Sequence, residues 1–221
     1  SKAAAPVGTG LTAYGTGGMT VPASEVPTYV KDTPSDPKPP VVTTAPAADT
    51  FPLGEVSTAS VPGVKRCAIA SSDTQACWEL ADPAMTDIPD YFLEGNNDLT
   101  GTLKVGPAVK TIGASAFANT KLAGLDLSKA TSLVEIGHGA FYAATNLAGT
   151  LVIPNTVTKI GPDAFYYTEL TGLDLSKATS LVEIGERAFS DTNLEGTLAV
   201  PNTVTTIGDA AFYYTKLTGL Y

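Results

Sequence analysis

Basic residues are scarce in this 221-residue chain and never cluster. It holds 13 Lys and Arg against 22 Asp and Glu, which gives a formal net charge of −9. Binding to nucleic acid or to an anionic membrane surface depends on a patch or stripe of basic side chains. The sequence therefore predicts that neither is a partner, and the acidic charge is expected mainly to keep a soluble protein dispersed.

Long apolar runs are also missing. No stretch approaches the roughly 18 apolar residues that a membrane-spanning helix needs. The chain opens on SKAAAPVG without an initiating Met. We therefore expect no transmembrane segment, although peripheral association with a membrane complex stays open, and we expect that any targeting peptide has been removed.

Catalytic motifs are absent as well. No phosphate-binding loop, nucleophile elbow or zinc-protease motif occurs. His138 is the single histidine, so every mechanism that needs an imidazole would have to use it. A related repeat has Glu186 at the matching position, which indicates an exposed turn residue. The sequence predicts no enzyme activity, no cofactor and no metal site.

Only two cysteines occur, Cys67 and Cys77, with nine residues between them. The polar stretch IASSDTQA could fold back and bring them together, which predicts a local disulfide and an oxidising compartment. A pair of free, buried thiols is the alternative. Metal binding has weak support, because there is no second cysteine pair and His138 lies far along the chain.

Proline separates the front of the chain from the rest, since ten of the 16 prolines lie at or before Pro62. Residues 1–61 are rich in Pro, Ala, Thr and Gly, which predicts an extended arm that cannot fold alone. Such an arm either packs on its own repeats or is ordered by other proteins. Its expected partner-binding anchors are the scattered apolar residues Tyr14, Met19, Val30, Phe51 and Leu53.

Two strings alternate through residues 99–221. The L-x-G-T-L string starts at Leu99, Leu147 and Leu194, and L-x-G-L-D-L-S-K-A-T-S-L-V-E-I-G occupies 122–137 and 170–185. Self-similarity with a period of roughly 23 to 25 residues indicates a solenoid. Leucines alternate with polar residues as in a short half-buried strand, and no helix-length amphipathic pattern occurs. We predict a mainly β solenoid with a parallel ladder of strands about 4.8 Å apart and the Phe residues as an internal spine.

Residues 62–98 are expected to form an N-terminal cap and a degenerate first repeat. In this repeat Ile88, Phe92 and Leu99 are assigned to the positions of Ile184, Phe189 and Leu194. The glycine that follows each repeated Ile indicates either a positive φ or a close backbone approach. At the other end the array stops at LTGLY as a further coil begins, which predicts more chain or a covering partner.

Tyrosines and outward-facing carboxylates are the candidate functional residues of the repeats. Asp126 and Asp174 fall in a predicted outward row with Lys104, Val152 and Ala199, where a Lys104–Asp126 pair is the simplest account. Tyr166-Tyr167 and Tyr213-Tyr214 recur two units apart, and Tyr142 is assigned to the corresponding place between them. Because Tyr is favoured in interfaces, we predict a partner-binding patch. Inward packing of some of these rings is the alternative.

The repeats resemble the BspA-like, or Treponema pallidum type, leucine-rich repeats, whose pattern ends in IG-x-x-AF. This element recurs five times, first at 112–117 and last at 207–212, so the resemblance covers about residues 85–221. The family's Cys after Phe is absent from the array. The resemblance implies a non-enzymatic surface or secreted binding protein, and it says nothing about the arm.

Two functional hypotheses follow. The first is a scaffold or linker subunit that docks on a larger complex through its arm and solenoid, such as an extrinsic lumenal subunit of a photosynthetic membrane supercomplex. The alternative is a secreted or cell-surface adhesion protein that binds protein or glycan through its strand face or its tyrosines. Both place the chain in an oxidising compartment, either an organelle lumen or the cell exterior.

Overall fold

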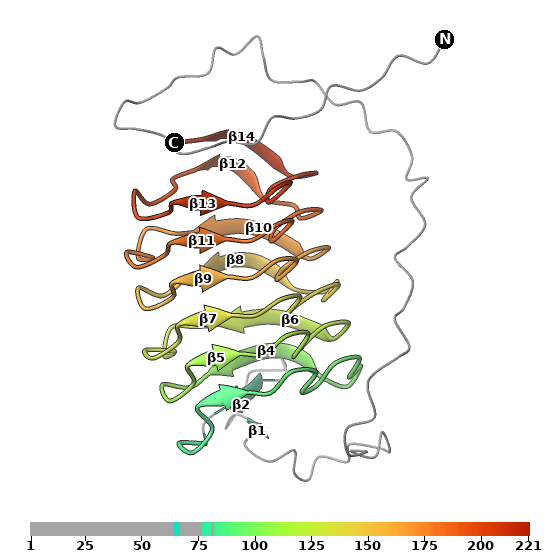
Figure 1. Ribbon diagram of the computed structural model, residues 1–221. Helices are drawn as coiled ribbons and strands as arrows, with labels where there is room; N and C mark the ends of the chain where they lie inside the picture. The colour runs from blue at the N-terminus through green and yellow to red at the C-terminus, as the bar shows by residue number, and fades with distance from the viewer. Residues whose placement is uncertain (1–63, 67–76, 81) are drawn as a thin grey trace, which may run out of the picture. The chain divides into compact units, whose positions relative to one another are not determined.

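A stack of β coils makes up the described part of the chain (Figure 1). The computed structural model describes residues 64–66, 77–80 and 82–221, and this part contains no helix. The arm and Cys67 lie outside these residues. Each coil places a longer strand on one face and a two-residue strand on the other. The mainly β solenoid predicted from the repeats is confirmed.

The two-residue strands form one continuous parallel ladder in the order β13-β11-β9-β7-β5-β3. Each strand pairs its isoleucine with the isoleucine of the next coil, as Ile136 does with Ile160. The ladder arises because these isoleucines recur at an almost constant spacing along the sequence, so every coil returns to the same point. The strands are β3 (Asp87–Ile88), β5 (Thr111–Ile112), β7 (Glu135–Ile136), β9 (Lys159–Ile160), β11 (Glu183–Ile184) and β13 (Thr206–Ile207).

The longer strands pair in separate groups. Their sheets have the orders β1-β2-β4-β6, β10-β8 and β12-β14, and within the described residues no ladder joins β6 to β8 or β10 to β12. Among the described strands, only β1 is antiparallel to its neighbour. The strands are β1 (Val64–Arg66), β2 (Cys77–Leu80), β4 (Thr100–Val105), β6 (Lys121–Asp126), β8 (Ala148–Val152), β10 (Glu169–Asp174), β12 (Glu195–Leu198) and β14 (Lys216–Leu220).

The alternation of the two strings explains this grouping. Every paired step in the array runs from an L-x-G-T-L strand to an L-x-G-L strand, which has one residue fewer between its leucines. The ladder absorbs the difference as a register shift, for example between Leu170 and Gly172. Thr150 lies over Gly172, where a Cβ would come within 2.6 Å of the Thr150 hydroxyl oxygen. The glycine therefore permits the close pairing.

Phenylalanines stack through the core as predicted. The ring centroids of Phe117, Phe141, Phe165 and Phe189 follow one another at 5.3, 5.2 and 5.2 Å, with the planes within 15° of parallel. All four rings are fully buried. Phe212 continues the stack at 5.6 Å. One Phe per coil thus joins all the central coils into one apolar column.

The first coil departs from its predicted alignment. The backbone N–H of Leu93 donates to Ala116, in the same way that Phe117 donates to Ala140. Leu93 therefore occupies the spine position, and the assignment of Phe92 to that position was wrong. Phe92 instead meets Phe117 edge-on, with centroids 6.3 Å apart and planes at 86°. Phe92 thus lies across the end of the phenylalanine column. This suits a terminal coil, because Phe92 covers the outer side of Phe117.

The glycine after each Ile is explained by close approach and not by a positive φ. A Cβ on Gly185 would lie 2.4 Å from the backbone nitrogen of Pro162 in the preceding coil. Gly113, Gly137, Gly161 and Gly208 are crowded in the same way, at 2.3 to 2.8 Å from backbone atoms. Five positions of the repeat are thus fixed as glycine by the coil spacing.

A threonine follows the spine phenylalanine by three residues in most coils. The buried hydroxyls of Thr120, Thr168 and Thr192 each donate to the carbonyl oxygen of the Phe three residues earlier, at 2.8 to 3.0 Å. Each hydroxyl therefore satisfies a backbone carbonyl in the turn that follows the spine residue.

Candidate partner-binding surface

The turn after each short strand contains two residues in left-handed conformation. These are the third and seventh residues after the repeated Ile, and most of them are not glycine. From Tyr91 to Asp191, their N–H groups donate to carbonyls of the next coil, as Tyr167 does to Ser190 at 3.1 Å. The turns therefore form a hydrogen-bonded ladder of their own along one edge of the solenoid. The third residues are Tyr91, Ser115, Gly139, Asp163, Arg187 and Ala210, and the seventh are Gly95, Asn119, Ala143, Tyr167, Asp191 and Tyr214.

This edge gathers the predicted tyrosines into what we call the tyrosine surface. Tyr142 stacks on Tyr166 at 5.4 Å between ring centroids, and Tyr166 lies 6.2 Å from Tyr167. The ring centroids of Tyr213 and Tyr214 are 4.1 Å apart. The tyrosine surface comprises Tyr142, Tyr166, Tyr167, Tyr213 and Tyr214.

The order of these tyrosines differs from the prediction in one respect. Tyr142 belongs to the coil before Tyr166, and the coil between the two Tyr pairs carries Ser190 and Asp191. Along the solenoid, the tyrosine surface therefore has three stacked rings, then one coil with polar residues in their place, and then two more rings. The alternative of inward packing holds in part, because Tyr142 and Tyr166 are half-buried while Tyr167, Tyr213 and Tyr214 are exposed.

An ion pair lies in the same turns. Arg187 donates to both carboxylate oxygens of Asp163 from the next coil, with distances of 2.9 and 3.1 Å. The Asp163 side chain is 10% exposed and Arg187 is half-exposed. A two-point contact of this kind fixes both planes. Tyr and Arg are also the residue types enriched at the centres of protein interfaces.

The half-buried rings have perturbed ionisation. Partial burial raises the pKa of Tyr142, and the Asp163 carboxylate raises it further. Burial likewise raises the pKa of Tyr166, with Asp191 as the next contributor. The folded state thus holds these protons more tightly than the unfolded chain. Their contribution to stability is complete below about pH 10 and is lost as the pH rises through the folded pKa values.

Alkaline titration should resolve these two tyrosines. We expect tyrosinate absorbance of the folded protein to include a late step, which disappears when the chain is unfolded in urea. The double variant Tyr142→Phe/Tyr166→Phe should lose that step. Asp163→Asn should move the ionisation of Tyr142 to lower pH, because it removes a neighbouring negative charge. A late step that survives the double variant would contradict the assignment.

Sequence reasoning missed Tyr91. Its side chain is 53% exposed and its φ is +58°. It lies in the first coil, on the same edge as the tyrosine surface, but at the third position after Ile and not at the sixth or seventh. Its place three positions after Ile88 was available in the sequence, but no tyrosine recurs at that position in the other coils, so the search for recurring tyrosines did not find it.

The outward row on the longer strands is confirmed as strand register in two halves, but no ion pair joins Lys104 to Asp126 within the described residues. Lys104 pairs in register with Asp126, and Val152 pairs with Asp174. Partial burial raises the pKa of Asp126, but the hydrogen bonds from Ser128 and the charge of Lys104 together bring it below its ordinary value. Ala199 lies beyond the end of β12, so it does not continue a strand-paired row.

The remaining predicted residues are placed as follows. His138 is exposed in a turn, as expected. Cys77 begins β2 and is partly buried, whereas Cys67 lies outside the described residues, so their disulfide stays a prediction. The arm anchors are also outside the described part of the chain. Within 64–66, 77–80 and 82–221, no group of three metal-ligating side chains converges and no helix could cross a bilayer. The anchors concerned are Tyr14, Met19, Val30, Phe51 and Leu53.

Comparison with known proteins agrees with this architecture. The family model described as BspA type leucine rich repeat region matches residues 110–221 in six copies. The comparison with curated proteins found no match.

Two solved structures are similar in fold. The pneumococcal vaccine antigen PcpA is 24% identical, with a TM-score of 0.47 over 54% of this chain and 29% of that chain. A leucine rich cell surface protein from Faecalibacterium prausnitzii A2-165 is 20% identical, with a TM-score of 0.42 over 73% of this chain and 54% of that chain. This chain therefore spans between about a third and a half of their lengths.

Proposed function

Because the chain belongs to the BspA-type leucine-rich repeat family, we propose that it is a non-catalytic binding protein of the cell surface or cell exterior. In this proposal it captures a protein partner on the tyrosine surface. The fold supplies a rigid column of coils, and the left-handed turns present the rings along one edge. Fold alone does not assign a function, so the proposal depends on the chemistry of that edge.

One observation carries the proposal. Tyr167 and Tyr214 are 55% and 45% exposed, yet their φ angles are +57° and +52°. A bulky residue in this region is a backbone outlier that costs roughly 1–2 kcal/mol relative to glycine. Rings that are half outside the core regain only part of that cost by packing. Every coil has this left-handed turn, and the other coils have Gly95, Asn119, Ala143 and Asp191 at the same position. What distinguishes Tyr167 and Tyr214 is the large exposed ring at that position, which supplies contact area at low entropic cost.

This proposal replaces the hypothesis of a scaffold or linker subunit that docks on a larger complex. That hypothesis rested on the Pro-rich arm, which lies outside the described residues, whereas the alternative rests on the repeats and on the family that they define. The family resemblance supports a surface or exterior location, which also fits the predicted disulfide. We therefore do not carry forward the photosynthetic supercomplex or the organelle lumen.

A pair of glycine variants tests the proposal. Tyr167→Gly/Tyr214→Gly removes two rings and relieves two strained backbones, so its thermal stability should equal or exceed that of the wild type. Ala143→Gly/Ala210→Gly is the matched control, since both alanines have left-handed φ angles of 51° and 55° and neither carries a ring. The wild type and the two variants are immobilised and offered a defined set of purified extracellular glycoproteins.

The tyrosine variant should lose a glycoprotein that wild type and control both retain, with a decrease in affinity of at least about tenfold for two interface tyrosines. If all three proteins retain the same glycoproteins with equal affinity, the tyrosine surface is not the binding site and the proposal fails.

A further inference from the structure

One coil interrupts the tyrosine surface, and a carboxylate stands there between two exposed rings. In the three coils nearest the C-terminus, the seventh residues after the repeated Ile are Tyr167, Asp191 and Tyr214. Hydrogen bonds place them on successive steps of the turn ladder. The Tyr167 N–H donates to Ser190 at 3.1 Å, and the Asp191 N–H donates to Tyr213 at 2.9 Å. We call Tyr167, Asp191 and Tyr214 the Tyr-Asp-Tyr site.

The spacing of the coils suits one cation between the two rings. The spine rings of the same three coils follow one another at 5.2 and 5.6 Å, close to the ladder spacing of about 4.8 Å. Tyr167 and Tyr214 are thus roughly 10 Å apart along the solenoid, with Asp191 midway. A cation at the level of Asp191 would be about 5 Å from the level of each ring. Attraction between a cation and a ring face extends to about 6 Å from the ring centroid.

Each side of the site consists of two rings. Tyr166 lies 6.2 Å from Tyr167, and Tyr213 lies 4.1 Å from Tyr214, measured between ring centroids. The coil between them has serine and aspartate at these positions, and both are much smaller than tyrosine. Aromatic side chains therefore border the aspartate in both directions along the solenoid.

The Asp191 carboxylate is not neutralised by an ion pair within the described residues. It accepts one hydrogen bond, from the Ser190 hydroxyl at 2.9 Å. Arg187, the arginine of the same turn, contacts two other carboxylates instead. Burial raises the pKa of Tyr166, and the charge of Asp191 raises it further. The carboxylate therefore acts on the aromatic side of the site as a negative charge.

The turns that carry these rings are acidic as a group. Segments 161–168, 185–192 and 208–215 contain one basic residue, Arg187, against four acidic residues. A partner that approaches this edge meets a negative potential, which favours basic side chains in both encounter and orientation. The acidic residues are Asp163, Glu186, Asp191 and Asp209.

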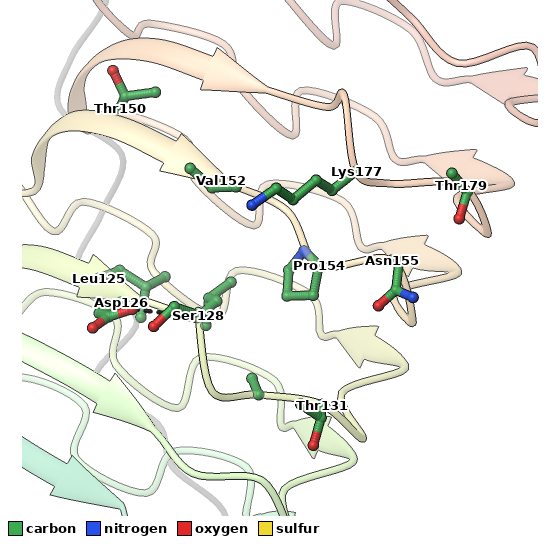
Figure 2. Close-up of a pocket in the computed structure, with 12 residues that line it drawn as sticks. Leu125, Asp126, Ser128, Thr131, Thr150, Val152, Pro154, Asn155, Lys177 and Thr179 are labelled. Carbon is green, nitrogen blue, oxygen red and sulfur yellow. Dashed lines mark hydrogen bonds between the residues drawn. The ribbon is translucent and has the colours of Figure 1, made fainter.

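The hollow at the turns after the longer strands lacks such a combination. Coils with the L-D-L-S-K-A-T-S string have two residues more between the strand leucine and the repeated Ile, so long turns alternate with short ones. The long turns 128–131 and 176–179 line the hollow together with the short turn 154–155 (Figure 2). Asp126 and Lys177 bring opposite charges to it. Its lining favours no ligand class, and we place no ligand there.

We propose that the Tyr-Asp-Tyr site takes one lysine or arginine side chain from a basic segment of the protein partner. The inference rests on the proposed function, because it names the chemistry by which the tyrosine surface recognises that partner. The cation lies between the rings of Tyr167 and Tyr214 and donates a charge-assisted hydrogen bond to Asp191. The methylene groups of the same side chain pack on the ring faces.

Two other kinds of partner segment fit less well. An acidic segment would meet the four carboxylates of these turns. An apolar segment would cover the Asp191 carboxylate without pairing it, which is costly. Both become outcomes of the test.

The probe is an acetylated and amidated hexapeptide of three Gly-Arg repeats. It is titrated into the full chain at low ionic strength, and NMR of the tyrosine rings follows binding. Peptides with Glu or Leu in place of Arg are the comparison. Saturable binding is expected for the arginine peptide alone, and added salt should weaken it because the charges are near the surface.

Two charge variants test the carboxylate. Asp191→Asn keeps the shape of the side chain and should weaken binding of the arginine peptide about fivefold, the upper end for an ion pair near the surface. Asp98→Asn is the matched control, since it makes the same change in net charge at an exposed position in the first coil. That coil is four coils away, about 19 Å by the strand spacing, well beyond a Debye length of about 8 Å. The control should leave the affinity unchanged.

Two ring variants test the aromatic faces. Tyr167→Leu/Tyr214→Leu keeps apolar bulk at both positions but removes the faces, and it should weaken binding about tenfold. Tyr167→Phe/Tyr214→Phe keeps the faces and should retain the wild-type affinity. The unfolding temperatures of both variants are measured to confirm that they fold. Equal affinities of the Leu and Phe variants would contradict a role for the ring faces.

The inference is overturned by absence of saturable binding, by full affinity of Asp191→Asn, by an equal loss in Asp98→Asn, or by preference for the Glu or Leu peptide. Its failure is distinguishable from failure of the proposed function. If Tyr167→Gly/Tyr214→Gly loses a glycoprotein that Asp191→Asn retains at full affinity, the tyrosine surface binds its partner without this cation, and only the inference fails. If the glycine variant retains every glycoprotein while the arginine peptide still requires Asp191, the proposed function fails.

Discussion

Replacing Phe165 with alanine is expected to lower the free energy of unfolding by about 3–5 kcal/mol, the usual cost of removing a buried Phe. Phe165 is fully buried and has a stacked ring 5.2 Å away on each side. The cavity cannot collapse easily, because the backbone ladders on either side fix the distance between coils. Urea unfolding of the full chain, followed by circular dichroism, measures the loss.

Phe212→Ala is the matched control for this prediction. It removes the same ring from the end of the column, where Phe212 is only partly buried and has one stacked neighbour within the described residues. Its cost should be clearly smaller than that of Phe165→Ala. Equal costs at the two positions would show that the phenylalanines do not act as one stacked column.

Adding a single methyl group at Gly185 should be nearly as damaging. In Gly185→Ala the new Cβ would lie 2.4 Å from the Pro162 nitrogen and 2.5 Å from the Gly161 carbonyl carbon. Both are backbone atoms of the neighbouring coil, so relief requires the two coils to separate. We expect a loss of about 3 kcal/mol, the upper part of the range for overpacking, together with weaker protection of the Gly185 region in hydrogen exchange.

Gly219→Ala is the control for the backbone clash. The nearest atom to its new Cβ is a Thr197 methyl group at 3.9 Å, an ordinary contact. This substitution should change stability little or raise it slightly, because alanine has less freedom than glycine in the unfolded chain. Equal destabilisation at both positions would mean that loss of glycine itself, and not close approach between coils, decides the effect.

The sequence was sufficient for the fold because one coil repeats almost unchanged. The repeats predicted the parallel stacking of coils and the phenylalanine column, since each depends on residues that return in every coil. They left positive φ and close approach both open at the glycine after Ile. The continuous ladder of short strands at the isoleucines was not foreseen, because the predicted strands were those at the alternating leucines. The degenerate first coil defeated this reasoning. One shifted residue made Phe92 look like a spine residue, when Leu93 has that position and Tyr91 reaches the surface.

The candidate sites were predicted less completely, for a geometric reason. Recurrence in the sequence shows that two residues share a place in their coils, and it located the tyrosine surface. It does not show the backbone conformation at that place, so the left-handed φ of Tyr167 and Tyr214 was not foreseen. Recurrence also does not show where the surface is hollowed. Long and short turns alternate along the array, and no single residue of the pattern marks the space that this alternation leaves.

The longer strands pair in groups of two coils, and this pairing limits how the repeat array can gain or lose coils. The L-D-L-S-K-A-T-S string starts at Leu125 and again at Leu173. The block between these two starts contains one paired and one unpaired step between longer strands, together with one long turn and one short turn. Duplication or loss of such a two-coil block would leave every neighbour relation intact. A gain or loss of one coil would place two like strands side by side, without the Thr-over-Gly contact of a paired step. We therefore expect related arrays to gain or lose coils in pairs, and not as single repeats.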